Sequence, residues 1–249
     1  MKYPRIEVRE LKKSFDETVI LDHINFKVHV GESLVIIGAS GSGKSVLTKC
    51  IVGLLKPDDG EIFLDGHQLE TNSSHSKPVA ANLISYVFQN SALFDSLTVI
   101  ENISFGPQFL NKQNKRDANE IARESMEKLD IHPKFWPMHP KELSSSLRKI
   151  VAIARALAVK PKMIIFDEPS TGLDTRASHK LDHLIRDSVK NNNITAITIT
   201  HDMNSALQIA DTIAMLQGGK LIWSGKSSEL KKSNHAEVKH FIKPFATST

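Results

Sequence analysis

Short apolar runs bounded by turn residues alternate with amphipathic stretches along much of this chain. Residues 33–37, 163–166 and 196–200 form three such runs, and each contains isoleucine among other apolar residues. Continuous runs of this length are typical of strands that are buried on both faces of a parallel sheet. A helical pattern follows the first run at 46–51 and the second at 177–188. This alternation of strands and helices predicts an α/β fold.

The N-terminal part has a different pattern, in which apolar and polar residues alternate one by one. Residues 6–11 and 24–30 both alternate in this way, and a short strand is expected at 61–66. Strict alternation is typical of strands with one buried face, so these segments predict an antiparallel β flap. Residues 70–80 are polar, and we expect them to form an exposed loop. Residues 84–88 are the next predicted strand.

Between residues 90 and 160 the periodicity is mainly helical. Apolar residues recur three and four positions apart at 118–129, and a second helical pattern covers 141–159. Proline-containing pairs at 132–140 interrupt the helices with a bend. Further on, residues 213–223 predict a terminal hairpin around two glycines, and a short helix and a tail are expected after it.

A glycine-rich segment, Gly38-Ala39-Ser40-Gly41-Ser42-Gly43-Lys44-Ser45, connects the first apolar run to its helix. Strand, glycine-rich loop and helix in this order are the context of a phosphate-binding loop. Its glycines let successive N–H groups point into one hollow, and the helix adds the positive end of its dipole. Lys44 is placed to reach the β- and γ-phosphates, and Ser45 is placed to bind Mg²⁺. The residues of this segment that we expect to contact ATP are Ser40, Gly41, Ser42, Gly43, Lys44, Ser45 and Val46.

These patterns together predict an α/β fold with a P-loop NTPase core of the RecA-like kind, an N-terminal antiparallel β flap and an inserted helical subdomain. We expect a single domain over residues 1–249. Its nucleotide-binding core and flap take residues 1–89 and 160–249, and its helical subdomain takes residues 90–159.

Polar residues stand where three predicted strands end. Asp167 and Glu168 are adjacent, so their side chains point to opposite sides of a strand. This suits Asp167 to the Mg²⁺ shell and Glu168 to the attacking water. Gln89 is expected to complete the Mg²⁺ sphere or to sense the γ-phosphate, and His201 to hold the γ-phosphate and the water. The alternatives are a solvated turn before Pro169, a surface glutamine and an ordinary polar histidine.

Phe15 stands in a loop-like setting between the first two strand patterns. Its flat ring suits stacking on adenine, and a core residue at a strand end is the alternative. The residues expected to act in catalysis are Glu168, His201 and Lys44.

Two histidines four positions apart, His179 and His183, form a possible metal pair. With Asp182 and Arg186 they are predicted to lie opposite the apolar stripe of their helix, and the glutamate of a zinc-protease motif is missing. A solvated helix face is therefore the prediction for all four.

Composition and charge indicate the cellular compartment and the kinds of partner that we expect. The single cysteine, Cys50, excludes a disulfide framework and is typical of a reducing compartment. The net charge is +4, but the cations are scattered and no nucleic-acid-binding motif is present, so we expect no nucleic-acid partner. No signal-peptide core opens the chain, and no apolar run approaches the roughly 20 residues that span a bilayer. A role at a membrane would need a partner.

In their order along the chain, these motifs resemble the ATP-binding cassette family, the ATPase subunits of ABC transporters. The phosphate loop, Gln89, the acidic strand end and His201 follow the order of that family. Residues 169–174 match its D-loop, and residues 142–157 align with its signature loop and helix. The resemblance covers essentially the whole chain. It implies an ATPase with ATP and Mg²⁺ bound, a homodimer around two ATP molecules, and coupling to a membrane permease.

The signature loop departs from the family pattern Leu-Ser-Gly-Gly-Gln, because it reads Leu143-Ser144-Ser145-Ser146-Leu147. In the family this loop reaches across a head-to-tail dimer to the γ-phosphate of the partner's ATP. The resemblance implies that the residues acting in trans are Ser144, Ser145, Ser146 and Asp174. Glycine permits a close backbone approach that serine hinders, so we expect slower hydrolysis or weaker dimerisation than in a glycine version.

A narrower resemblance links residues 88–102 to the Mla/Mkl-type cassettes, which serve bacterial lipid transporters with MCE-domain proteins. Lys44–Leu47 and the apolar Leu147 are also similar to these cassettes. The resemblance implies phospholipid or a related lipid as cargo and an MCE-domain protein in the complex. It also implies a permease contact near residues 89–105, and a location on the cytoplasmic face of the inner membrane, held there by the permease.

Three alternatives stay open. The first is the cassette of an amino-acid or methionine importer, although such cassettes often add a regulatory domain for which this chain has no room. The second is a hydrolysis-impaired nucleotide switch, which the altered signature suggests and which Glu168 and His201 argue against. The third is a soluble ABC protein of translation or repair, which would usually carry two cassettes or a coiled-coil insertion.

Overall fold

A six-stranded sheet forms the centre of the molecule in the computed structural model, which describes residues 3–69 and 83–243. Its strands, in spatial order, are β10 (Lys220–Lys226), β9 (Thr212–Gln217), β3 (Ser33–Ile37), β8 (Thr195–Thr200), β7 (Met163–Asp167) and β6 (Ile84–Val87). All neighbours run parallel except β9 and β10, which pair as an antiparallel hairpin. The predicted C-terminal hairpin is therefore confirmed. The polar loop expected at 70–80 lies outside the described residues.

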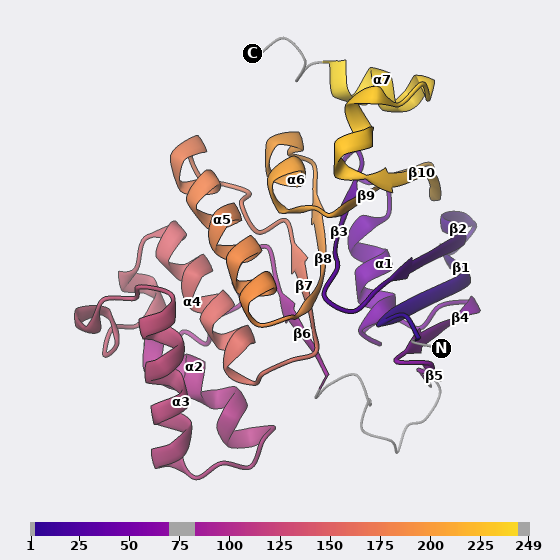
Figure 1. Ribbon diagram of the computed structural model, residues 1–249. Helices are drawn as coiled ribbons and strands as arrows, with labels where there is room; N and C mark the ends of the chain where they lie inside the picture. Colours follow the sequence, from indigo (N-terminus) through magenta and orange to yellow (C-terminus); the bar gives the residue numbers. More distant parts are fainter. Residues whose placement is uncertain (1–2, 70–82, 244–249) are drawn as a thin grey trace.

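A second, antiparallel sheet is built mainly from the N-terminal part of the chain. Its order is β2 (Thr18–Val28), β1 (Ile6–Phe15), β4 (Asp59–Leu64) and β5 (His67–Gln68). The one-by-one alternation of apolar and polar residues predicted this flap, and the structure confirms it. Figure 1 shows helix α1 (Lys44–Ile51) between this sheet and the central sheet.

The central strands are buried on both faces because each face has its own helical or sheet cover. In β3, Val35 and Ile37 belong to the core cluster on the side of the larger helices, whereas Leu34 and Ile36 belong to the cluster on the side of α1 and the flap. This explains why β3 reads as a continuous apolar run rather than as an alternating one. Helices α5 (Thr175–Asn191) and α6 (Met203–Ile209) lie on the first of these sides (Figure 1).

The chain between β6 and β7 is helical, as its periodicity predicted. It contains α2 (Val99–Phe109), α3 (Lys115–Lys128) and α4 (Ser145–Ala158), with short 3₁₀ turns at Pro133–Phe135 and Pro140–Glu142. These helices gather at one end of the molecule (Figure 1). The chain closes with a 3₁₀ segment, Ser227–Lys232, and with α7 (Ala236–Ile242).

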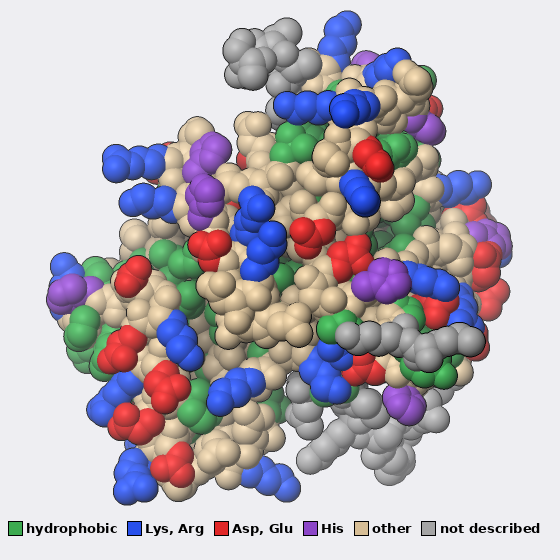
Figure 2. All heavy atoms as spheres, in the orientation of Figure 1, with side chains coloured by type: hydrophobic (Ala, Val, Ile, Leu, Met, Phe, Trp, Pro, Cys, Tyr) green, Lys and Arg blue, Asp and Glu red, His purple; other side chains and the backbone are tan. Residues whose placement is uncertain are grey.

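The surface carries both signs of charge in close mixture. On the face shown in Figure 2, lysine and arginine side chains are interspersed with aspartate and glutamate rather than gathered into one basic patch. None of the described helices combines the length and the apolar character that crossing a membrane would require.

Candidate active site

An open cavity of about 640 Å³ lies at the carboxyl ends of the central strands, where the phosphate loop, the flap and three strand ends meet. In parallel α/β sheets this edge is where ligands bind. Most of the residues predicted for the nucleotide site line it together. The lining consists of Phe15, Ile20, Ser40, Gly41, Gly43, Lys44, Ser45, Val46, Gln89, Glu168 and His201.

The N-terminus of α1 opens into this cavity without a capping side chain. Gly43 precedes the helix with a φ of 102°, and no described side chain accepts a hydrogen bond from the first turn. By contrast, α2 to α6 all begin with a side-chain cap. The first N–H groups of a helix need acceptors, and an anion can supply them. The buried Oγ of Ser42 also has no partner among the described residues.

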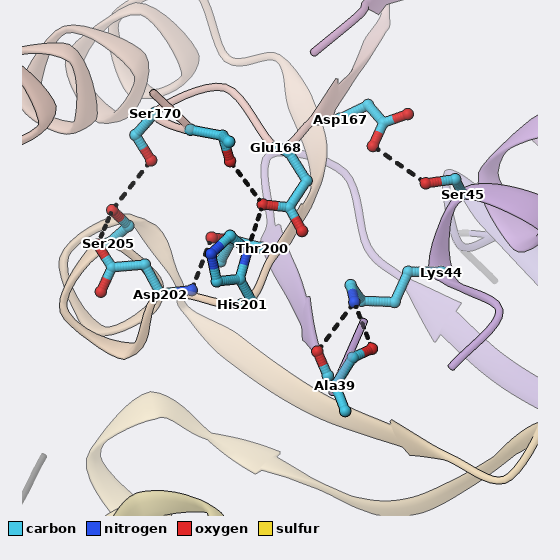
Figure 3. Close-up of polar contacts among 12 residues, drawn as sticks. Ala39, Lys44, Ser45, Asp167, Glu168, Ser170, Thr200, His201, Asp202 and Ser205 are labelled. Carbon is cyan, nitrogen blue, oxygen red and sulfur yellow. Dashed lines mark hydrogen bonds and ion pairs between the residues drawn. The ribbon is translucent and has the colours of Figure 1, made fainter. Parts of the chain in front are cut away.

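Lys44 is the cation of this cavity. Its Nζ donates to the carbonyl oxygens of Gly38 at 2.9 Å and Ala39 at 3.0 Å, two residues of the same loop (Figure 3). The side chain is largely buried, and burial lowers the pKa of Lys44, while the carboxylates of Glu168 and Asp167 oppose that change. The loop thus holds a buried ammonium group at the wall of the cavity.

Asp167 is the last residue of β7, and it faces α1. Its Oδ1 accepts a hydrogen bond from Ser45 Oγ at 3.3 Å, and its Oδ2 accepts one from Tyr86 OH at 2.8 Å. Burial raises the pKa of Tyr86 above its usual value, so the phenol keeps its proton. The phenol oxygen also lies 3.0 Å from Thr48 Oγ1 on α1. Tyr86 therefore fixes the orientation of the Asp167 carboxylate.

The oxygen donors at this place fit Mg²⁺. Hydroxyl, carboxylate and amide oxygens come from Ser45, Asp167 and Gln89, and Mg²⁺ prefers a few such ligands together with phosphate oxygens and water. No group of three or more histidine, cysteine, aspartate or glutamate residues in the described part of the chain is arranged to hold a metal. A Mg²⁺ site here would depend on the phosphates of a bound nucleotide.

Glu168 turns away from Asp167 and points toward the segment after β8. Glu168 directly follows the last residue of β7, and its backbone φ of 50° turns the chain away from the direction of the strand. Its Oε2 accepts a hydrogen bond from Thr171 Oγ1 at 2.8 Å and lies 2.7 Å from His201 Nδ1 (Figure 3). The histidine ring remains exposed, whereas the Glu168 carboxylate is largely shielded. The carboxylate of Glu168 and the ring of His201 are thus in direct contact at the wall of the cavity.

Phe15 ends β1, so the loop-like setting expected for it is only partly right. The residue is 44% exposed, lines the cavity and has the Lys13 ammonium 5.4 Å from its ring centroid. The turn at Asp16 and Glu17 keeps the ring at the tip of the flap rather than in the core. A flat aromatic face is thus available at the rim.

The residues implied to act in trans lie elsewhere on the chain. Ser144 precedes α4, and its Oγ accepts a hydrogen bond from Leu147 N at 3.3 Å. Asp174 precedes α5 and caps it through Ala177 N at 2.9 Å. Both are exposed, and neither they nor Ser145 and Ser146 line the cavity. One chain therefore does not bring these residues to its own phosphate loop.

Helix α4 holds the segment after β6 through two cations that were not predicted from the sequence, the buried Lys149 and the half-buried Arg155. Lys149 Nζ donates to the carbonyl oxygen of Gln89 at 3.0 Å. Arg155 donates to the carbonyl oxygens of Ser91 at 3.0 Å and Ala92 at 2.8 Å. Burial lowers the pKa of both cations. A basic residue on the apolar face of a predicted helix was the available signal.

The predicted solvated face of α5 is wrong at one residue. Asp182 is 2% exposed, because it lies on the same helix face as Ser178 and Ile185 and packs toward α6. His179 and His183 are exposed, as predicted, and His179 Nδ1 lies 3.1 Å from Gln208 Oε1. The apolar stripe is therefore wider than the sequence pattern indicated, and it includes an acid.

Comparison with known proteins shows which family this chain resembles. A family model described as ABC transporter matches residues 21–171. The glutamine transport ATP-binding protein GlnQ of Escherichia coli is 35% identical over 228 residues, which are 92% of this chain and 94% of that protein. The sulfate/thiosulfate import ATP-binding protein CysA of Bradyrhizobium diazoefficiens is 34% identical over 230 residues. That match covers 92% of this chain and 65% of the relative, so the chain spans about two thirds of its length.

Solved structures share the fold. The dimeric ATP-binding cassette MJ0796 in a post-hydrolysis state, with ADP and phosphate bound, has a TM-score of 0.79 and 28% sequence identity, with 89% of this chain and 98% of that chain covered. The cbiO1 protein of Clostridium perfringens, part of the ABC transporter complex cbiONQ, has a TM-score of 0.84 and 28% identity. That match covers 98% of this chain and 96% of the other.

Proposed function

Because the chain belongs to the ABC transporter family and is an ABC-type ATPase, we propose that two copies bind two ATP molecules and drive a membrane permease. The observation that carries this proposal is the cavity in which an uncapped helix N-terminus, Lys44, Glu168 and His201 meet. Free N–H groups and an ammonium group suit phosphate, while an acid and a histidine suit the activation of water.

The roles that we assign follow from this geometry. The loop amides and Lys44 hold the phosphates, and Phe15 stacks on adenine. Ser45, Asp167 and Gln89 hold Mg²⁺, which, when bound, neutralises charge on the phosphate oxygens. Glu168 accepts a proton from the attacking water, and His201 donates a hydrogen bond to the γ-phosphate. The contact between Glu168 and His201 keeps both groups oriented before the nucleotide arrives.

A dimer is proposed because one chain leaves its own site half open. Ser144, Ser145, Ser146 and Asp174 are available at the surface but lie away from the cavity of the same chain. In a head-to-tail pair they would cover the partner's γ-phosphate. The similarity to a dimeric cassette with ADP and phosphate bound supports this arrangement.

The permease is proposed to dock on an aromatic surface beside Gln89. The tilted rings of Phe94, Phe105 and Phe109 contact one another in a row, with centroids 4.8 and 4.4 Å apart, and the outer two residues are 43% and 62% exposed. Exposed apolar surface of this kind is typical of interfaces. Lys149 and Arg155 tie the adjoining backbone to α4, so movement at this surface reaches the signature loop.

For the cargo, we propose a small solute taken up by an importer. The named relatives serve glutamine, sulfate or thiosulfate, and in Pectobacterium atrosepticum a related protein serves Fe(3+) import. This supports the importer alternative better than the lipid assignment with an MCE-domain partner, which rests on residues 88–102, on Lys44–Leu47 and on Leu147. Reconstitution of the chain with its permease separates the two. ATP-dependent uptake of glutamine, sulfate or Fe(3+) supports the importer, whereas ATP-dependent phospholipid movement alone overturns it.

The assignment of Glu168 is tested by Glu168→Gln in the complex with the permease. The amide keeps the size of the side chain but cannot accept the proton, so ATP binding should stay within about threefold while turnover falls on the order of 100-fold. Phosphate release and binding of a fluorescent ATP analogue measure the two. Glu124→Gln, on the exposed side of α3, is the matched control. Full turnover in Glu168→Gln would refute the role of the acid.

A further inference from the structure

A buried side chain links two loops that the proposed mechanism uses. The Oγ of Ser205 on α6 lies 2.6 Å from Asp182 Oδ2 of α5, 3.1 Å from Asp202 Oδ2 and 3.2 Å from Ser170 Oγ. Asp182 is 2% exposed and Ser205 is 1% exposed. One hydroxyl thus contacts three different segments: helix α5, the segment after β7 and the start of α6.

The two segments held in this way are those that contact Glu168. Ser170 directly precedes Thr171, and Asp202 directly follows His201. Thr171 Oγ1 and His201 Nδ1 both contact Glu168 Oε2, at 2.8 and 2.7 Å. In Figure 3, the contact from Ser170 to Ser205 and the contacts of Glu168 lie on either side of the same pair of loops. Contacts therefore lead from Glu168 to the Ser170 segment, on to Ser205, and back to Glu168 through the Asp202 segment.

The protons of this group can be counted. Ser205 has one hydroxyl hydrogen, and two carboxylate oxygens lie within hydrogen-bonding distance of it. If Asp182 and Asp202 are both ionised, one of the two contacts places two acceptors against each other. If Asp182 carries a proton, it donates to Ser205 Oγ, and Ser205 donates to Asp202. Ser170 then supplies its own hydrogen to Ser205 Oγ, and every contact becomes a hydrogen bond.

Burial favours the protonated form of Asp182. Burial raises the pKa of this carboxyl to about 6, the charge of Asp202 adds to the rise, and the Ser205 hydrogen bond together with His179 and His183 lowers it. The second oxygen, Asp182 Oδ1, is buried and has no hydrogen-bond partner among the described residues. An unpaired oxygen costs less in a neutral acid than in a carboxylate.

We propose that protonated Asp182 is a positioning residue of the ATPase, because its proton completes the network that holds the Ser170 and Asp202 segments, and hence Glu168 and His201, in place. The proposal rests on the roles given above to Glu168 and His201. Asp182 lines a small cavity of 170 Å³ behind these segments and is not one of the residues lining the nucleotide cavity. Its effect should therefore fall on the rate of hydrolysis rather than on ATP binding.

The test uses three variants in the complex with the permease. Asp182→Asn retains a donor toward Ser205, whereas Asp182→Leu fills the space without one. Asp187→Asn, on the exposed side of α5, is the matched control and should leave turnover unchanged. Below pH 6, where Asp182 carries its proton, we expect Asp182→Leu to lower kcat on the order of tenfold with an unchanged KM for ATP, and Asp182→Asn to keep the wild-type kcat. Thermal unfolding and ATP binding confirm that each variant is folded.

The pH dependence of kcat distinguishes a positioning role of the Asp182 proton from a purely structural role, which would leave this dependence unchanged. The folded-state pKa of about 6 lies above the ordinary value of 3.8, so the proton of Asp182 is lost as the pH rises through about 6. The ratio of kcat in Asp182→Asn to kcat in the wild type should therefore rise several-fold over the same range, because the amide does not titrate. The ratio also cancels any pH dependence that the two proteins share.

Two results would overturn the inference. One is a kcat in Asp182→Leu that equals the wild-type kcat below pH 6, and the other is a fall of kcat in Asp182→Asn that is as deep as in Asp182→Leu at that pH. Glu168→Gln is measured in parallel. If Glu168→Gln loses turnover while the Asp182 series does not change, the positioning role alone fails. If Glu168→Gln keeps full turnover, the proposed mechanism fails, whatever the Asp182 series does.

Discussion

The two helix N-termini that we assign to ATP phosphates, those of α1 and α4, are built in opposite ways. α1 begins after Gly43, with no described side chain capping its first turn. α4 begins after Ser144, whose Oγ accepts a hydrogen bond from Leu147 N, and Ser145 and Ser146 occupy its first two positions. The first end leaves its N–H groups for a ligand, and the second has already satisfied one of them from within the chain.

This difference separates two steps of the proposed cycle. Binding of ATP to one chain depends on α1, which is open in the free protein. Closure of the dimer depends on α4, where a phosphate has to approach past serine Cβ atoms and compete with the Ser144 cap. Changes at α1 should therefore act on ATP affinity, whereas changes at Ser145 and Ser146 should act on turnover in the assembled complex.

The largest effect is expected from Gly43→Ala. The φ of Gly43 is 102°, and a Cβ there would lie 2.9 Å from the Ile20 carbonyl oxygen, so the loop has to shift. Loss of two phosphate hydrogen bonds, each worth about 1.5 kcal/mol, should weaken ATP binding on the order of 100-fold, measured by titration calorimetry.

Gly53→Ala is the matched control for this change. Gly53 also has a positive φ, of 76°, but a Cβ there meets nothing within 4 Å, and the residue lies beyond the other end of α1. It should lower stability through backbone strain and leave ATP affinity unchanged. Wild-type affinity in Gly43→Ala would contradict the view that the α1 end forms the phosphate site.

An intermediate effect is expected from Ser145→Gly combined with Ser146→Gly. Removing both Cβ atoms lets the α4 backbone approach the partner's phosphate, so the ATPase rate of the complex should rise by roughly three- to tenfold, which is about 1 kcal/mol. Ser145→Ala combined with Ser146→Ala keeps the Cβ atoms and should bring no gain. An unchanged or lower ATPase rate in the glycine variant would contradict the hypothesis that these Cβ atoms slow hydrolysis. ATP affinity of the single chain should be the same in all three proteins.

Features of the two helix N-termini that lie within short stretches of sequence could be predicted from the sequence. The phosphate loop, its flanking strand and helix, and the serine-containing signature are each contained in a short stretch, so pattern alone identifies them. Glu168 and His201 were also predicted at strand ends, because apolar runs mark where buried strands stop. Their contact with each other follows from the neighbouring positions of β7 and β8.

The parts that depend on packing between distant segments could not be predicted in this way. Tyr86 and Asp167 are 81 positions apart, and nothing in the strand pattern of residues 84–88 marks the phenol as a partner of the acid. Asp182 was predicted on a solvated face because it was expected to lie opposite the apolar stripe of its helix. Its burial arises from α6, which packs on that side of α5 and supplies Ser205.

The smallest effect is expected from Ser144→Ala, measured on the single chain without nucleotide. The change removes the α4 cap, which should lower the free energy of unfolding by about 1 kcal/mol. For a chain of this size that is a fall in Tm of roughly 2–4 °C. Ser144→Asn offers another acceptor to Leu147 N and should keep the wild-type stability. Equal unfolding temperatures of Ser144→Ala and Ser144→Asn would show that the Ser144 cap does not stabilise the N-terminus of α4. The N-termini of α1 and α4 would then differ only in the Cβ atoms of the α4 serines.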